Sequence, residues 1–179
     1  MFCLYEQAEP MASNRSNAIV SILFVLFGGP GITLVYLPFW ITRFRIPARE
    51  PLWQIGIAAA LIAVGLVPLF ESVVRFVRVG RGTLVPTAPT KRLVVSGLYR
   101  YVRNPMYVGV LTSIAGEVLL FGSRDMVIYL LSVGLLIHLF VCFYEEPVLT
   151  RRHPADYPVY TLNVPRWLPR RRPWSGIQQ

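Results

Sequence analysis

Arginines, tyrosines and an Asn-Pro pair lie close together in the stretch LVVSGLYRYVRNPMYVG, residues 93–109. Asn104 before Pro105 is typical of a helix start, because asparagine is a good N-cap and proline suits the first helical position. The first turn of such a helix has backbone N–H groups without partners and a positive dipole end, which favour a bound carboxylate or phosphate. Arg103 would strengthen that preference, and Tyr107 would add a ring face and a hydroxyl one turn along. A capped membrane helix with a snorkelling arginine and an interfacial tyrosine is the alternative that these residues leave open.

A second chemical feature is the adjacent pair Glu145 and Glu146. We expect the pair at the C-terminal end of an apolar helix, where the helix dipole disfavours negative charge. A cation or a hydroxyl-rich group should therefore offset it. Arg151, Arg152 or loop arginines would do so in a surface ion-pair network, whereas a bound ammonium or ribose diol would do so in a ligand site. Both interpretations stay open at this point.

Other polar residues lie inside apolar stretches. Glu117 is one, and an ionisable group there is costly and functional by default. His138, Cys142 and Glu145 follow i, i+4, i+7 spacing, which predicts one shared helix face. Counted from the turn near Ser123, Glu117 and His138 should not lie level. We therefore expect Glu117 to be neutral and hydrogen-bonded, or close to the far membrane interface.

Several site classes lack support. The sequence has no Walker loop, GxGxxG fingerprint, GxSxG elbow or HExxH motif. With two histidines and with Cys3 far from Cys142, neither a metal centre nor a disulfide framework is expected.

Composition predicts an all-α integral membrane protein. Of the 179 residues, 54% are hydrophobic and 15% are charged, and the mean hydropathy is +0.51. The net charge of +9 could suggest a nucleic-acid partner, but the basic residues lie between apolar spans, so none is expected. Membrane lipids are the expected surroundings, and the oligomeric state is left open.

Four apolar stretches approach the roughly 20 residues that cross a bilayer. The first should be kinked by its Gly28–Gly31 cluster, and the third has clear ends at Asn104 and Gly122. The four predicted spans are residues 17–41, 52–70, 105–122 and 126–144.

With four spans, 14 of the 18 basic residues fall on one side of the membrane. The positive-inside rule then places both termini and the central loop in the cytoplasm, in a multi-pass protein. We expect one transmembrane domain, 1–179. Its parts are an N-terminal tail (1–16), two spans (17–70), a loop without a continuous helix (71–104), a helical hairpin (105–144) and an interfacial tail anchored by Trp167 and Trp174 (145–179).

The order GLYRYVRNPMYVG, helical hairpin, EEPVL, DYPVY and VPRWLP resembles the isoprenylcysteine carboxyl methyltransferase family and its bacterial relatives, including the phospholipid N-methyltransferase branch. The resemblance covers about residues 83–169. It implies a membrane-embedded enzyme with a cytoplasmic site that uses S-adenosylmethionine. The implied acceptor is lipophilic or lipid-linked: a prenylcysteine-like carboxylate, a phospholipid amine or a small thiol.

The hypothesis of in-line methyl transfer assigns roles to single residues. Arg103 and Glu146 would act in catalysis, Arg103 or Arg166 would orient an anionic acceptor, and Tyr107 or Glu146 would assist deprotonation of an amine or thiol. The resemblance also implies the cofactor contacts. One glutamate of the pair, Glu145 by preference, would complete the cofactor pocket. Its other predicted contacts are Leu93, Val94, Tyr99, Asn104, Pro105, Met106 and Tyr107.

Three positions depart from the family pattern. Asn104 stands where the family has histidine, His153-Pro154 replaces a Phe-Gly, and the arginine that prenylcysteine enzymes carry before the acidic pair is missing. The last difference argues against a prenylcysteine carboxylate as acceptor. A non-catalytic lipid-binding or scaffold protein is the alternative function. A small transporter would need paired polar residues at one depth, which the offset of Glu117 and His138 disfavours.

Overall fold

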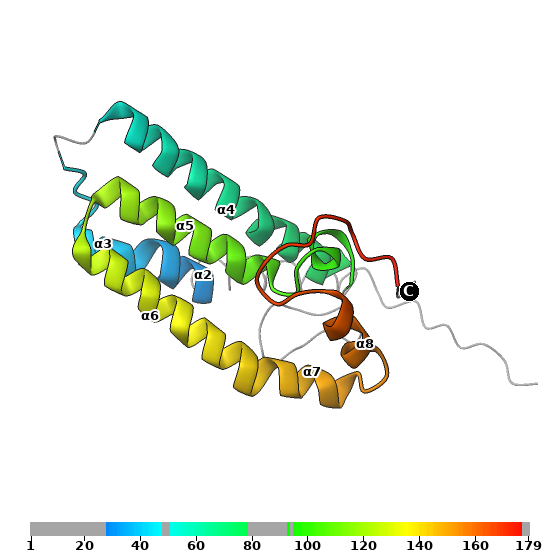
Figure 1. Ribbon diagram of the computed structural model, residues 1–179. Helices are drawn as coiled ribbons and strands as arrows, with labels where there is room; N and C mark the ends of the chain where they lie inside the picture. Colours follow the sequence, from blue (N-terminus) through cyan, green and yellow to red (C-terminus); the bar gives the residue numbers. More distant parts are fainter. Residues whose placement is uncertain (1–27, 48–50, 79–92, 94, 177–179) are drawn as a thin grey trace, which may run out of the picture.

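The computed structural model describes residues 28–47, 51–78, 93 and 95–176, and every regular element in these ranges is a helix (Figure 1). The expected all-α class is therefore confirmed for this part of the chain. The predicted N-terminal tail, the first part of the first span, residues 79–92 of the predicted central loop and Val94 lie outside the described residues.

Three long helical rods make up the body of the fold. α4 (Leu52–Arg78), α5 (Pro105–Phe121) and α6 (Arg124–Phe140) lie side by side, with α5 in the middle (Figure 1). A fourth helical segment packs against α5 and α6. It consists of α2 (Gly29–Gly31), a π-helical turn η1 (Ile32–Tyr36) and α3 (Leu37–Thr42). The predicted kink at Gly28–Gly31 borders on residues outside the described part, and from Gly29 the chain continues as helix.

Small residues let α4 and α5 approach closely. A Cβ atom on Gly65 would lie 2.5 Å from the Gly109 carbonyl oxygen, and one on Gly116 would lie 2.7 Å from the Ala58 carbonyl oxygen. Ser113 Oγ lies in the same interface, 3.4 Å from the Ile62 carbonyl oxygen. Close backbone approach through small residues is the usual packing of helices in membranes.

The hairpin between α5 and α6 turns where the sequence predicts. Gly122 adopts the left-handed conformation at φ 55°, which glycine tolerates without strain. Ser123 then caps α6, because its hydroxyl accepts a hydrogen bond from the Asp125 N–H at 3.2 Å. The predicted ends of the third span are confirmed to within one residue.

The predicted second span, residues 52–70, agrees to within two residues with Leu52–Ser72, the part of α4 that is long and apolar enough to cross a membrane, and α4 itself is described as far as Arg78. One other predicted end is wrong. The fourth span runs to Arg152 rather than Tyr144, because α6 continues through a π-helical turn η3 (Val141–Glu145) into α7 (Glu146–Arg152). This continuous helix, Arg124–Arg152, is here called the long helix. Glu145 and Glu146 therefore lie inside a helix and not at its C-terminal end.

Two helices, Leu52–Ser72 and Arg124–Arg152, are long and apolar enough to cross a membrane. Only 17% and 11% of their most apolar stretches are buried inside the protein, so both present apolar surface outward, whereas the core helix of a soluble protein would be mostly covered. α5 is shorter, and the number of spans and the cytoplasmic location of the termini stay predictions.

The C-terminal segment folds back over the Pro105 end of the hairpin. A 3₁₀ turn η2 (Gly97–Arg100) precedes α5, and α8 (Asp156–Asn163) follows α7. Residues 164–174, here called the strap, bond to the η2–α5 connection through the backbone pairs Arg103 N to Pro165 O, Arg170 N to Tyr101 O and Trp174 N to Arg100 O, each 2.9–3.0 Å. The segment expected as an interfacial tail thus includes a helix and a strap that closes one end of the bundle.

Candidate functional site

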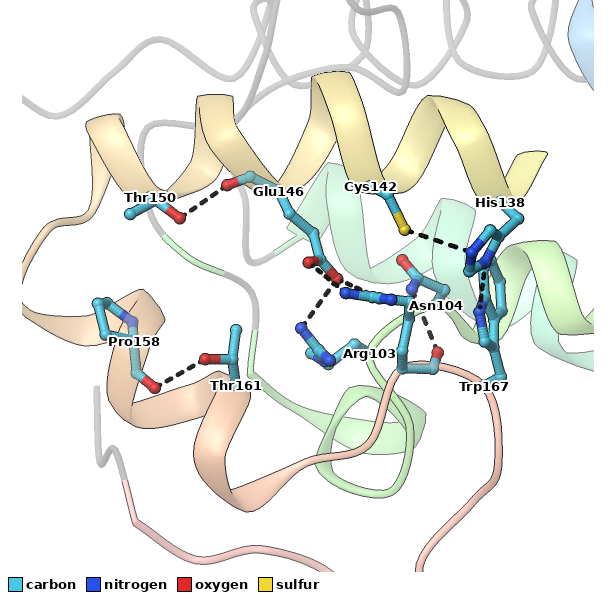
Figure 2. A network of polar contacts seen from close by, with 10 residues as sticks. Arg103, Asn104, His138, Cys142, Glu146, Thr150, Pro158, Thr161 and Trp167 are labelled. Atoms are coloured by element: carbon cyan, nitrogen blue, oxygen red, sulfur yellow. Dashed lines mark hydrogen bonds and ion pairs between the residues drawn. The ribbon is translucent and has the colours of Figure 1, made fainter. Parts of the chain in front are cut away.

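Arg103, Glu146 and Arg166 form a cluster where the strap crosses the long helix. Figure 2 shows Arg103 and Glu146 of this cluster. Glu146 accepts three hydrogen bonds: from Arg103 Nη1 at 2.9 Å, from Arg166 Nε at 2.7 Å and from Arg166 Nη2 at 2.8 Å. The Arg103 side chain is only 11% exposed, that of Glu146 17% and that of Arg166 31%. The hydrogen bonds to Glu146 raise the pKa of the Arg166 guanidinium, so Arg166 stays charged. This cluster ties the η2–α5 connection, the long helix and the strap together.

Glu145 faces a different partner. Its Oε2 accepts a hydrogen bond from the Tyr107 hydroxyl on α5, at 3.0 Å. Glu145 forms no ion pair with the two arginines that hold Glu146. The two predicted halves of the site, residues 93–109 and the acidic pair, are therefore in contact through both glutamates.

The π-helical turn η3 partly explains why the side chains of Glu145 and Glu146 point to different partners. Consecutive side chains on a helix already point about 100° apart, and a π turn inserts one extra residue that changes the direction of the side chains after it. Glu146, rather than the predicted Glu145, therefore continues the row of His138 and Cys142, and Figure 2 shows these three with Thr150 along one face.

Asn104 stands at the N-cap position, but its side chain does not cap α5. Its Nδ2 donates instead to the Arg166 carbonyl oxygen of the strap, at 3.2 Å, and the residue is only 8% exposed (Figure 2). The predicted side-chain cap is therefore wrong, because tertiary contact with the strap competes successfully for the amide. No side chain in the described ranges bonds to the first-turn N–H groups of α5.

The N-terminus of α5, which no described side chain caps, lies beside Arg103, whose guanidinium has one N–H without a partner in the described part of the chain. Arg103 Nε is buried and finds no hydrogen-bond partner among the residues that the structure describes, and the same holds for Ser96 Oγ in the turn before η2. An uncapped helix N-terminus and a buried, unpaired guanidinium N–H suit a carboxylate. Glu145, across from them on the long helix, suits an ammonium or a diol. These donors and acceptors fit an amino-acid-like ligand such as the methionine part of S-adenosylmethionine.

A family model described as phospholipid methyltransferase matches residues 53–155 of the chain. The chain belongs to the phospholipid methyltransferase family. No curated protein and no solved structure matches it. Membership indicates methyltransferase activity and, with the two apolar helices, a membrane protein. The matched segment runs from the start of α4 to the residue before α8, so it includes Arg103, Glu145 and Glu146 and ends before the strap.

In this methyltransferase a layer of buried tyrosines supports the site, and two of them, Tyr157 and Tyr160, follow the matched segment. Leu93, Tyr157, Tyr160 and Val164 form a buried cluster, against which Trp174 packs. The Tyr160 hydroxyl donates to the Tyr99 carbonyl oxygen at 2.7 Å. Burial raises the pKa of Tyr157 to about 12, helped by the charge of Glu146 and opposed by Arg103, and burial also raises the pKa values of Tyr99 and Tyr160. All three phenols are therefore neutral near pH 7.

The structure gives the predicted cofactor residues different surroundings. Tyr107 and Glu145 face each other, and Pro105 and Met106 form the open first turn of α5. Leu93 and Tyr99 lie in or beside the tyrosine layer, and Asn104 bonds to the strap. Val94 lies outside the described residues.

The sequence patterns indicated neither Ser96 nor the contact of Trp167 with the long helix. The Trp167 indole N–H donates to His138 Nδ1 at 3.2 Å, and His138 Nε2 lies 3.7 Å from Cys142 Sγ (Figure 2). Since Trp167 comes from the strap, only the folded chain reveals this contact.

Proposed function

We propose that the chain is an S-adenosylmethionine-dependent methyltransferase that transfers a methyl group, at the cytoplasmic face of a membrane, to a lipophilic acceptor. The observation that carries this proposal is the pairing of an uncapped α5 N-terminus and a spare Arg103 Nε–H with the Glu145 carboxylate opposite. Family membership supports the reaction type. The positive-inside count of the sequence supports the cytoplasmic side.

Particular residues would hold the cofactor. The N–H groups of Met106 and Tyr107 and Arg103 Nε–H would bind its carboxylate, and Glu145 would bind its ammonium or a ribose hydroxyl. When bound, the cofactor supplies an electrophilic sulfonium methyl group.

The chain's own contribution is mainly alignment, since methyl transfer to a ready nucleophile needs little more than proximity and exclusion of water. Tyr107 holds Glu145 in place through its hydroxyl. Glu146 positions Arg103 and Arg166, and its three hydrogen bonds leave it poorly suited to accept a proton. Its predicted catalytic role is therefore better described as positioning. Arg166 stays the candidate for orienting an anionic acceptor, because its side chain is the most exposed of the three.

Among the acceptors that the sequence allows, we favour a phospholipid amine. The family model carries a phospholipid methyltransferase description. The chain also lacks the arginine that prenylcysteine enzymes have before the acidic pair. Incubation of membranes with radiolabelled S-adenosylmethionine should place label in the lipid fraction. Label in protein alone would refute the lipid acceptor.

Binding of S-adenosylmethionine to the detergent-purified protein, measured by isothermal titration calorimetry, tests the cofactor assignment. Glu145→Gln removes one charge-assisted contact, so we expect its Kd to rise roughly 10- to 100-fold. Thr150→Ala is the matched control, because Thr150 Oγ1 bonds within its own helix, to the Glu146 carbonyl oxygen at 2.8 Å. The absence of binding by the wild-type protein at millimolar cofactor would refute the enzyme and favour the non-catalytic scaffold.

A further inference from the structure

His138 is an exposed imidazole on an apolar surface. Its exposed neighbours on α6 are Leu135, Leu136, Leu139 and Phe140, all of which suit lipid. Pro105 lies 17 residues before the hairpin turn at Gly122, and Phe140 lies 17 residues after Ser123. Because both helices rise about 1.5 Å per residue, His138 lies almost level with the start of α5. It is therefore at the end of the bundle that carries the candidate site, on the side open to lipid.

Trp167 determines which nitrogen of His138 carries the proton. An indole N–H can only donate, so Nδ1 of His138 must accept the bond from Trp167 Nε1 at 3.2 Å. An imidazolium has no lone pair for such a bond, so this contact requires the neutral ring with its proton on Nε2. The ring contact, with centroids 5.9 Å apart, further fixes the imidazole.

The Nε2–H of His138 has no strong acceptor in the described part of the chain. The neighbour that it meets is Cys142 Sγ at 3.7 Å, and thiol sulfur is a weak acceptor. A polar N–H exposed to an apolar medium is costly when it lacks a good partner. The arrangement thus presents one oriented, poorly satisfied donor beside the site.

The donor also belongs to the same helix face as the site. His138, Cys142 and Glu146 follow one another along the long helix and face Asn104 and Trp167 (Figure 2). His138 lies eight residues, about two turns, before Glu146, on the side of the Glu146 cluster where the sequence of the long helix is apolar.

We propose that His138 Nε2–H binds an oxygen atom in the polar group of the lipophilic acceptor, with Trp167 holding the required tautomer. His138 is thus a specificity-determining residue for the acceptor. It selects lipids in which a phosphate or carboxylate oxygen lies near the atom to be methylated, and it discriminates against lipids without such an oxygen. This inference rests on the proposed function but concerns the acceptor side, which can be measured without the cofactor.

The test is lipid binding to the delipidated, detergent-purified protein by native mass spectrometry, with no methyl donor present. Dioleoyl phosphatidylethanolamine supplies a phosphate oxygen, N-acetyl-S-farnesylcysteine supplies a carboxylate oxygen, and oleylamine has no oxygen. His138→Leu should weaken binding of at least one of the first two lipids about tenfold, equivalent to about 1.4 kcal/mol, and should leave oleylamine unchanged. The lipid that responds identifies the oxygen.

Two further variants separate hydrogen bonding from packing. His138→Gln keeps an N–H donor at a similar reach, so it should bind within about threefold of wild type. Trp167→Phe keeps an aromatic ring beside His138 but removes the indole N–H that holds the proton of His138 on Nε2. It should therefore weaken binding by a smaller factor than His138→Leu. In methyl-transfer assays the His138→Leu defect should appear in the KM for the acceptor rather than in kcat.

Equal binding of both oxygen-bearing lipids by wild type and His138→Leu would overturn the inference. An equal loss for oleylamine, or failure of His138→Gln to restore binding, would overturn it too by showing a packing effect. Calorimetric binding of S-adenosylmethionine, measured on the same variants, should not change. If wild-type protein binds no cofactor, the proposed function fails, whereas the lipid result is read independently.

Discussion

Replacement of Glu146 by glutamine should destabilise the protein more than any other single change in the site. The variant keeps the size of the side chain but removes the charge that holds two guanidiniums. Arg103 is the more affected partner, because its side chain is only 11% exposed and Glu146 is its ion-pair partner at 2.9 Å. Breaking such a buried pair from one side costs about 3–5 kcal/mol.

Arg166 adds little to this cost. Its side chain is 31% exposed, so water molecules can replace much of its interaction with the Glu146 carboxylate. Ion pairs near the surface contribute about 1 kcal/mol or less. The glutamine oxygen still accepts one hydrogen bond, and Tyr157 remains beside Arg103, which favours the lower end of the range. We therefore expect a loss of about 3 kcal/mol in the free energy of unfolding.

Thermal unfolding of the detergent-purified protein measures this loss. At roughly 2–4 °C per kcal/mol for a chain of this size, the midpoint of Glu146→Gln should fall by about 6–12 °C. Glu145→Gln is the matched control, because it keeps an oxygen that can accept from the Tyr107 hydroxyl, and weakening that bond should cost about 1 kcal/mol.

Two outcomes of this comparison would contradict the roles assigned to Glu145 and Glu146. If Glu146→Gln unfolds within about 2 °C of wild type, a shift that corresponds to 1 kcal/mol or less, the cluster does not hold the site together. If Glu145→Gln proves the less stable of the two, the assigned division between a structural and a ligand-binding glutamate is reversed.

Three more substitutions test other parts of the structure. Asn104→Ala should lower stability by about 1 kcal/mol by freeing the Arg166 carbonyl, yet leave the Kd for S-adenosylmethionine within about threefold; a much larger rise would mean that Asn104 contacts the cofactor. The folded-state pKa of Tyr157 is about 12 against an ordinary 10, so its contribution to stability is complete below pH 10 and is lost as the pH rises toward 12. Tyr157→Phe should therefore flatten the fall of the unfolding midpoint across that range, and an unchanged fall would contradict the assignment. Gly65→Leu would push against the backbone of Gly109 and should cost at least about 2 kcal/mol, seen as a lower unfolding midpoint; wild-type stability would contradict the close helix contact.

Local signals predicted those parts of the fold that depend on neighbouring residues. The third span begins at Pro105 and ends at a left-handed Gly122, as an Asn-Pro start and a Gly-Ser stop indicate. The end of the long helix was misplaced for a related reason. Hydropathy shows where the apolar stretch ends, but a helix continues into polar sequence until a breaker stops it, and here the helix ends at Arg152, shortly before Pro154.

The site was predictable only in part. Ordered motifs placed residues 93–109 opposite the acidic pair, and the structure brings them together. They could not give the partner of each glutamate, because a π-helical turn leaves no signal in composition and rotates the residues after it. Nor could they give the partner of Asn104, since a cap preference of about 1 kcal/mol is easily overridden by contact with a strap 62 residues away.

The position of the strap bears on how the site is completed. The family model ends at residue 155, yet Arg166 supplies two of the three hydrogen bonds to Glu146, and Trp167 supplies the bond that orients His138. Two adjacent residues of the strap therefore contact the long helix at two places: Arg166 bonds to the charged Glu146, and Trp167 bonds to His138, about two turns nearer the hairpin turn. The charged contact holds the strap to the long helix and the neutral contact orients His138, so both depend on two adjacent residues that lie beyond the segment matched by the family model.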